Sequence, residues 1–137
     1  RNIQINGFIP QKEMADIMRT KDIFILPSYF EGLGLIAVEA LGSGLRAVTT
    51  NINGLIELLG DKINNSGVIE YVKMPTIYNV DKAVEEEKPD FIKRLVESIE
   101  KQIARTIKNR KIDEEILSEI LKNSWKSKIE TIYENIK

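Results

Sequence analysis

The sequence predicts an α/β fold in which a parallel sheet is flanked by helices. Three observations carry this prediction. Strand-like and helix-like runs alternate in the first half of the chain, joined by two to seven residues, which is typical of parallel βα units. Ile23–Leu26 is a continuous apolar run ended by Pro27, as expected for a strand buried on both faces of such a sheet. From about residue 90 the pattern is helical throughout.

The N-terminal residues predict a strand and a short helix. Polar and apolar residues alternate from Asn2 to Asn6, and Gly7 follows, so we expect a strand over residues 2–6. After Pro10, apolar residues at positions i, i+3 and i+4 predict a short helix with one buried stripe: Met14, Ile17 and Met18.

The next segment repeats the strand and helix alternation. A loop over residues 28–34 leads into an apolar helix over residues 35–41, which Gly42-Ser43-Gly44 ends. Residues 45–50 then form a β-branched strand. Within it we expect Arg46 to be a surface residue at the strand entry.

The pattern weakens after Asn53. Residues 54–59 predict one or two helical turns, and residues 67–72 predict a further strand. Residues 73–88 have no clear periodicity, and their charged part, 81–88, is expected to be solvated and mobile.

The last third predicts three amphipathic packing helices. Thirteen acidic and thirteen basic residues from Asp81 onward balance each other, so no basic stripe is expected on these helices. The apolar positions of the three helices are Phe91, Ile92, Leu95, Val96, Ile99, Ile103 and Ile107, then Ile112, Ile116, Leu117, Ile120 and Leu121, then Trp125, Ile129, Ile132, Tyr133 and Ile136.

Composition narrows the classes of function. With 137 residues, we expect one domain over residues 1–137, with a helical extension from about residue 90. The net charge of −1 gives no overall field to hold nucleic acid or an acidic membrane. The absence of Cys and His removes disulfides, thiolate nucleophiles, zinc clusters and the commonest general base. No apolar run reaches the roughly 18 to 20 residues of a membrane span, so a cytoplasmic protein is the default expectation.

The candidate site is the segment from Pro27 to Ala40. It follows a buried strand and starts a helix, which in an open α/β sheet is the edge where ligands bind. A helix N-terminus offers free N–H groups and partial positive charge, and Gly32 and Gly34 allow close backbone approach. This combination suits a phosphate.

Two carboxylates flank this anion site. A carboxylate beside bound phosphate would be repelled, so Glu31 and Glu39 are expected to face neutral groups that donate hydrogen bonds, such as sugar hydroxyls. The arrangement then predicts sugar, diphosphate and ribose in sequence along the segment. The alternative is a plain strand, loop and helix, with Glu31 a solvated loop residue and Glu39 a charge on a helix face.

These residues also carry a family resemblance. Seven residues separate Glu31 from Glu39, and the run PSYFEGLGLIAVEALGSG resembles the EX7E segment of retaining glycosyltransferases of the GT-B fold, in the large family 4 group. The resemblance extends through NGFIP and DIFILPS upstream, and through AVTTNINGLIELLG, SGVI and NSWKSKIETIYENI downstream. The resemblance to the family is weaker from about residue 71 to residue 120. It implies a Rossmann-like domain, the C-terminal donor-binding half of a GT-B enzyme that lacks its N-terminal part.

The resemblance implies a role for each motif residue. Glu31, as the catalytic residue, contacts the hydroxyls of the donor sugar, and Glu39 binds the ribose hydroxyls. The backbone in between faces the diphosphate and sugar. The donor-binding residues are therefore Glu31, Gly32, Leu33, Gly34, Leu35 and Glu39.

The resemblance also implies partners and cofactors. The reaction moves a sugar from a nucleotide-diphosphate sugar to an acceptor with retention of configuration, in surface polysaccharide or glycolipid synthesis. No cofactor is expected, and the absence of Asp-x-Asp and His predicts a metal-independent reaction. The acceptor would bind the missing N-terminal domain, the full-length protein could lie peripherally on a membrane, and this part alone would bind donor without turnover.

Two alternatives stay open from the sequence. One is a non-enzymatic α/β interaction module, in which the helical C-terminus is the binding surface and the two glutamates are incidental. The other is a nucleotide-sugar epimerase with the same GT-B fold.

Overall fold

The computed structural model describes residues 2–123 and 133–136. Its centre is a parallel sheet of three strands in the order β1 (Ile23–Leu26), β2 (Arg46–Thr50) and β3 (Ile69–Val72). Ile23 pairs with Arg46, and Ala47 pairs with Ile69. This confirms the α/β fold with a parallel sheet that the sequence predicts.

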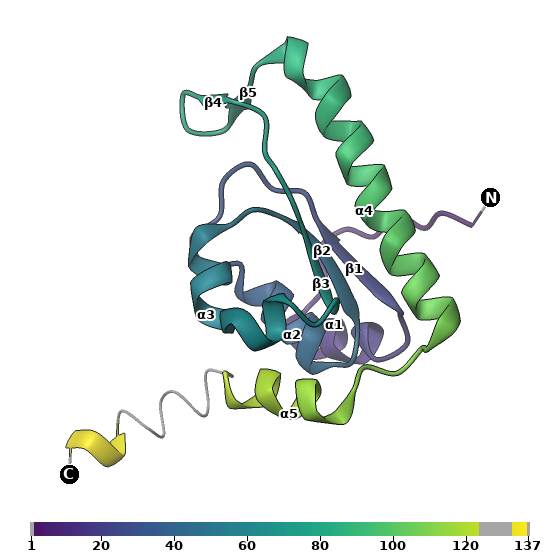
Figure 1. Ribbon diagram of the computed structural model, residues 1–137, viewed down its shortest axis with the longest axis vertical. Coiled ribbons are helices and arrows are strands. Elements are labelled where there is room, and N and C mark those ends of the chain that lie inside the picture. The colour runs from purple at the N-terminus through teal and green to yellow at the C-terminus, as the bar shows by residue number, and fades with distance from the viewer. Residues whose placement is uncertain (1, 124–132, 137) are drawn as a thin grey trace.

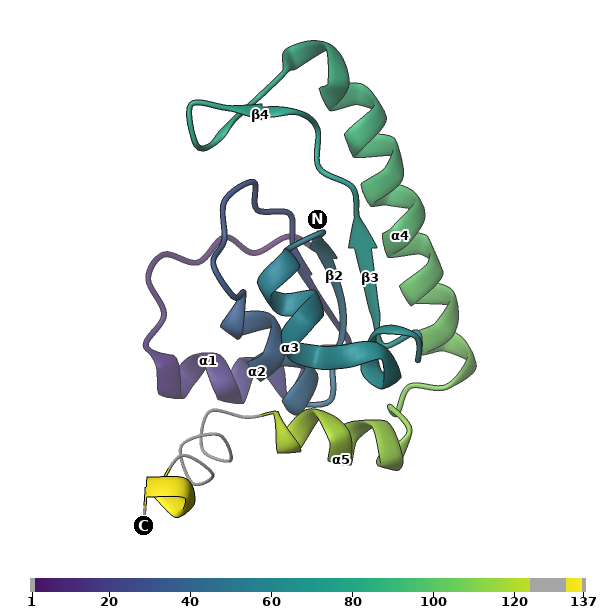
Figure 2. The same ribbon diagram turned by 60° about the vertical axis from the view of Figure 1, so that its left-hand side comes forward.

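Helices cover both faces of the sheet, as Figures 1 and 2 show. One face carries α1 (Gln11–Met18), α2 (Leu35–Gly42) and α3 (Asn53–Asn64), and α5 (Glu114–Lys122) packs against α2 and α3. The opposite face carries the long helix α4 (Lys88–Lys108), which packs on β2 and β3. The result is three layers with two separate apolar cores.

Successive side chains of each strand point to opposite faces of the sheet and so contribute to both cores. Ala47 and Ile69 face the side of α2 and α3, while Val48 and Val72 face Phe91 of α4. All five residues of β2 are buried, because β2 lies between two strands and two helical layers.

Strand β1 departs from the expected full burial. It is an edge strand, and its residue Ile25 is 42% exposed on the face where α4 covers β2 and β3. The continuous apolar run therefore predicted the strand correctly. The prediction that both faces of this strand are buried was wrong.

The expected strand over residues 2–6 is absent from the structure. Residues 2–9 have no regular secondary structure, and Ile3 and Ile5 are 81% and 93% exposed. A β-strand is stable only when its backbone groups pair with a neighbour, and β2 is the partner of β1 in the part of the chain that the structure describes. The alternating pattern of residues 2–6 therefore forms no strand, because no neighbouring strand pairs with this segment in the described part of the chain.

The middle elements differ in length from the prediction. Helix α3 continues past residue 59 to Asn64 across a kink at Gly60, whose φ is 77°. The strand predicted from residue 67 begins at Ile69, because Gly67 has a φ of 86° and belongs to the turn before it.

Residues 73–88, where the sequence shows no pattern, form a small antiparallel hairpin and a short 3₁₀ helix. The hairpin consists of β4 (Ile77–Tyr78) and β5 (Lys82–Ala83), and η1 (Glu85–Glu87) precedes α4. Thr76 donates to both carboxylate oxygens of Glu87, from its N at 2.7 Å and from its Oγ1 at 2.8 Å. Ala83 is buried, so the expectation of an entirely solvated stretch was wrong.

Arg46 is buried and not a surface residue. Its side chain lies under the C-terminal half of α4, where Nη2 donates to the backbone oxygen of Asn109 at 3.0 Å. Burial, with the nearby Arg105, lowers the pKa of Arg46. The local sequence gives no sign of this, because the acceptor comes from 63 residues further along the chain.

The two long predicted helices of the last third are present as α4 and α5. The third predicted helix, with Trp125, Ile129 and Ile132, lies mostly outside the described residues, while Tyr133 and Ile136 are described and exposed. None of the helices in the described part of the chain has the length and apolar character to cross a bilayer.

Candidate donor-binding site

The loop after β1 is held at the carboxyl end of the sheet. It runs over residues 27–34, and Thr50 at the end of β2 donates from Oγ1 to the backbone oxygen of Ser28 at 2.6 Å. Thr50 is fully buried, so this hydrogen bond forms away from competing water. The loop therefore starts from a fixed position beside the neighbouring strand.

Gly34 connects this loop to α2, and two features of this position favour glycine. Its φ of 62° and ψ of 39° lie in the left-handed region, and a Cβ here would meet Ile52 Cδ1 at 3.3 Å. As the N-cap of α2 it supplies no side-chain hydrogen bond. Ala37 N donates to the backbone oxygen of Gly34 at 2.9 Å, whereas the N–H groups before it have no partner within the helix. These N–H groups are left for an external acceptor such as an anion.

The loop packs against the start of α3 at a second glycine. A Cβ on Gly54 would lie 2.7 Å from the backbone oxygen of Gly32 and 2.9 Å from Leu33 Cδ2. Nearby, Asn51 Oδ1 accepts from the N–H of Met74 at 2.9 Å and so fixes the exit of β3. The turns after β1, β2 and β3 are thus connected, and the Asn51–Gly54 turn packs beside the loop.

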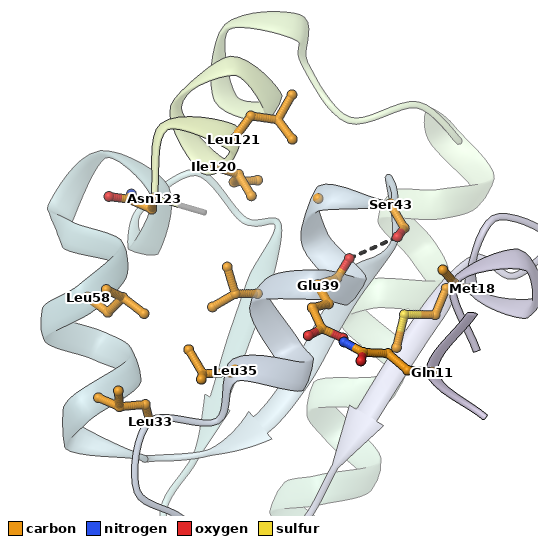
Figure 3. A pocket seen from close by; sticks show the side chains of 13 residues that line it. Gln11, Met18, Leu33, Leu35, Glu39, Ser43, Leu58, Ile120, Leu121 and Asn123 are labelled. Atoms are coloured by element: carbon orange, nitrogen blue, oxygen red, sulfur yellow. Dashed lines mark hydrogen bonds between the residues drawn. The ribbon is translucent and has the colours of Figure 1, made fainter. Parts of the chain in front are cut away.

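A cavity of about 550 Å³ lies beside this loop, between α1, α2, α3 and α5 (Figure 3). Most of its lining is apolar. The residues that line it are Gln11, Ala15, Met18, Leu33, Leu35, Val38, Glu39, Gly42, Ser43, Leu58, Ile120, Leu121 and Asn123.

The structure brings half of the predicted site residues to this cavity. Leu33, Leu35 and Glu39 line it, whereas Glu31, Gly32 and Gly34 belong to the loop and do not. The predicted segment therefore has two parts, a polar loop with its helix N-terminus and a helix face that borders an apolar hollow.

The two glutamates are both exposed but lie on different elements. Glu31 is in the loop, and Glu39 is the fifth residue of α2. Figure 3 shows the side chains of Glu39 and Gln11 next to each other, and Ser43 Oγ donates to the backbone oxygen of Glu39 at 2.9 Å. Within residues 2–123 and 133–136, neither carboxylate has a hydrogen bond or ion pair, so both can accept from the hydroxyls of a ligand.

Other ionisable groups at this end act within the protein. The carboxylate of Glu87 accepts both hydrogen bonds of Thr76, which lowers the pKa of Glu87. A hydrogen bond to Glu85 raises the pKa of Lys88. In the described ranges no three or more Asp and Glu side chains come together as they would around a metal ion.

Sequence reasoning missed several cavity residues. Gln11 comes from α1, Leu58 from α3, and Ile120, Leu121 and Asn123 from α5 and its end. No motif marks them, because their position depends on how three other helices pack on α2. Only the apolar spacing of α5 hinted that this helix had a face to bury.

Comparison with known families settles the class of protein. The model of a family described as glycosyl transferases group 1 matches residues 1–123. The chain belongs to this family. For a group 1 glycosyltransferase domain, the parallel sheet with flanking helices agrees with the Rossmann-like domain that the sequence resemblance implied.

Curated relatives match shorter stretches of the chain. An uncharacterized glycosyltransferase of Methanocaldococcus jannaschii is 29% identical over 69 residues, which is 50% of this chain and 17% of that protein. An O-antigen chain mannosyltransferase B of Escherichia coli is 32% identical over 59 residues, 43% of this chain and 16% of that protein. A third relative, also from Escherichia coli, is a UDP-Gal:alpha-D-GlcNAc-diphosphoundecaprenol alpha-1,3-galactosyltransferase, which is 39% identical over 44 residues, 32% of this chain and 11% of that protein.

The matched stretches therefore span between 11% and 17% of these relatives. No solved structure matches the chain. The retaining mechanism and the EX7E roles of Glu31 and Glu39 stay predictions.

Proposed function

We propose that this chain is the donor-binding part of a retaining glycosyltransferase that takes a sugar from a nucleotide-diphosphate sugar. The observation that supports this most is the uncapped glycine N-terminus of α2, held at the carboxyl end of the sheet between two exposed glutamates. Family membership favours a transferase over the non-enzymatic interaction module.

The diphosphate would lie against the backbone of residues 32–35. Gly32 and Gly34 place no side chain in the way, and the first N–H groups of α2 point out of the helix end. Negative charge grows on the diphosphate as its bond to the sugar breaks. Fixed N–H dipoles stabilise that charge most at this moment, which lowers the barrier without a metal ion.

The two glutamates would position the neutral parts of the donor. Glu31, in the loop, would accept hydrogen bonds from hydroxyls of the transferred sugar. Glu39, beside Gln11 at the cavity, would accept from the ribose hydroxyls. The two contacts would fix the sugar and the nucleoside on either side of the diphosphate.

The acceptor is proposed from the relatives. One is named for O-antigen chains and another for a diphosphoundecaprenol-linked sugar. We infer an acceptor in surface polysaccharide or glycolipid synthesis, bound outside these 137 residues. The chain alone should then bind donor and not turn it over.

A thermal-shift series tests the donor site. The chain is measured with UDP, GDP, ADP and their sugar conjugates, alone and with EDTA. Ligand at about 100 times its Kd should stabilise the protein by roughly 2.7 kcal/mol, which raises Tm by about 10 °C for a chain of this length. We expect one nucleotide family to give this shift, and EDTA to leave it unchanged.

Three variants make the test specific. Glu39→Ala should abolish the shift with nucleotide and sugar nucleotide alike, whereas Glu31→Ala should reduce only the gain from the sugar. Glu57→Ala is the matched control, since it removes another exposed glutamate at this end of the sheet and should keep the full shift. Unchanged donor affinity in Glu39→Ala would refute the proposed site.

A further inference from the structure

The two faces of the β4–β5 hairpin differ in burial. Ile77 pairs with Ala83, which is buried, so this pair faces the protein. Tyr78 pairs with Lys82 directly across the hairpin, and both residues are exposed. Because neighbouring residues of a strand point to opposite faces, Tyr78 and Lys82 share the outer face. The hairpin therefore presents a tyrosine ring that is 49% exposed and takes no part in its own packing.

The tip of the hairpin holds an apolar side chain in water on a strained backbone. Val80 is 68% exposed and has a φ of 75°, and Asp81 N donates across it to the backbone oxygen of Asn79 at 2.9 Å. So tight a turn is unfavourable for a β-branched residue, whereas glycine would form it without strain. Backbone strain of this kind is typical of segments that contact a ligand.

The base of the hairpin is anchored to the rest of the protein. Val84 N donates to the backbone oxygen of Thr76 at 3.0 Å, and Thr76 donates to both carboxylate oxygens of Glu87. Before the hairpin, Arg94 Nη2 donates to the backbone oxygen of Lys73 at 2.9 Å. A surface that is fixed in advance loses less conformational freedom when it binds a ligand.

Lys88 connects the hairpin to the loop after β1. Its pKa is raised chiefly by the hydrogen bond to Glu85, and Tyr29 in the loop and Tyr78 in the hairpin lie close enough to contribute. Tyr29 also packs against Phe91 of α4, with the ring centroids 5.5 Å apart. Figures 1 and 2 both show the hairpin and this loop at the same end of the sheet. The outer face of the hairpin thus continues toward the candidate donor site.

The charges of the hairpin and η1 disfavour an anionic ligand. Residues 77–88 carry four carboxylates and two lysines, and one of these lysines, Lys88, is paired with Glu85. Within the described ranges, the carboxylates of Asp81 and Glu86 have no hydrogen bond or ion pair, so they can accept from hydroxyls.

A sugar has both features that this surface would recognise. Its hydroxyls can donate to carboxylates, and the C–H groups on one face of its ring carry partial positive charge. The face of an aromatic ring carries partial negative charge, so the two faces can stack. A neutral sugar chain therefore fits an exposed tyrosine with free carboxylates nearby better than a phosphate or a nucleic acid does.

We propose that the outer face of the hairpin, with Tyr78 and Val80, binds a neutral sugar chain that accepts the transferred sugar. The inference rests on the proposed function, because it takes this sugar chain to be the acceptor of that reaction. The main acceptor site would lie outside these 137 residues, and the hairpin would hold sugar units of the same chain near the donor loop.

An NMR titration of the backbone amides tests the proposal. The chain is first saturated with the sugar nucleotide that gives the largest thermal shift, which keeps free sugars out of the donor site. Mannotetraose or chitotetraose is then added. We expect the amide signals of residues 77–83 to move and to saturate at millimolar oligosaccharide.

Three variants make this test specific. Tyr78→Ala should weaken oligosaccharide binding about fivefold, because the stacking contact is lost. Tyr78→Phe keeps the ring and should bind like the wild type. Tyr133→Ala is the matched control, since it removes another exposed tyrosine and should leave the affinity unchanged. The amide spectrum of each variant shows that the fold and the hairpin are retained.

Three results would overturn the proposal. They are wild-type affinity in Tyr78→Ala, an equal loss of affinity in Tyr133→Ala, and hairpin signals that neither oligosaccharide moves. Failure of the donor site would look different. In that case no nucleotide would raise Tm, while a titration without nucleotide would still move the hairpin signals and support the sugar-binding surface.

Discussion

Glycine at position 54 controls the geometry of the candidate site at the scale of single atoms. Because Gly54 has no Cβ, the backbone oxygen of Gly32 can approach it closely. A larger residue at position 54 would collide with this backbone atom, and no side-chain movement could relieve the collision. The position of the loop over residues 27–34 thus depends on a residue that lies outside the loop.

We expect Gly54→Ala to weaken donor binding at least tenfold and to destabilise the fold by about 1–3 kcal/mol. The added methyl would lie 2.7 Å from a backbone atom, so the loop must move. Titration with the preferred nucleotide and urea unfolding measure the two effects. Gly7→Ala is the control, since a Cβ there meets nothing within 4 Å. Wild-type affinity in Gly54→Ala would show that the loop geometry does not set binding.

At the scale of elements, a single carboxylate adds two hydrogen bonds at the base of the β4–β5 hairpin, beside the backbone bond from Val84 N to the oxygen of Thr76. Glu87 in η1 accepts both hydrogen bonds of Thr76, which precedes β4, and so closes the hairpin at its base. These two bonds, with the backbone N–H of Thr76 as the stronger cause, lower the pKa of Glu87.

The lowered pKa gives the hairpin a pH dependence of known sign. A carboxyl whose pKa is lower in the folded state stabilises the fold fully above its unfolded pKa, and this stabilisation is lost as the pH falls through the folded pKa. We therefore expect wild type to unfold at a higher temperature than Glu87→Gln at pH 7, and this advantage to shrink between about pH 5 and pH 3.

Thermal unfolding across that pH range measures the effect. Glu86→Gln makes the same change in formal charge at the adjacent exposed position, so its difference from wild type should stay nearly constant. A constant difference for Glu87→Gln as well would mean that the Thr76 contacts do not form in solution.

At the scale of the whole molecule, the N-terminal segment lies outside the packed layers. Ile3, Ile5 and Phe8 are 81%, 93% and 95% exposed, and the segment has no strand partner among residues 2–123. We expect deletion of residues 1–8 to change Tm by less than about 2 °C, since little apolar area leaves the core. A much larger fall in Tm would show that these residues are paired in solution.

The sequence predicted the helices and strands that form from a local pattern of apolar residues. The runs at 23–26 and 35–41 and the spacing of α4 were enough, because burial repeats with the period of the element. Predictions failed where the structure of a segment depends on residues far away in the sequence. Residues 2–6 lacked a neighbouring strand, and the burial of Arg46 depends on the oxygen of Asn109. The same holds for the site, where the loop and Glu39 were expected but Gln11 and the α5 residues were not.

The contact between Gly32 and Gly54 also limits how this end of the sheet can change during evolution. Two connections that meet backbone to backbone cannot lengthen separately, since one inserted residue in either would open the junction. The tip of the β4–β5 hairpin has no such constraint, because Asn79 and Val80 are exposed. In this domain, insertions should therefore accumulate at the hairpin tip, while the lengths of the turns after β1 and β2 stay fixed together.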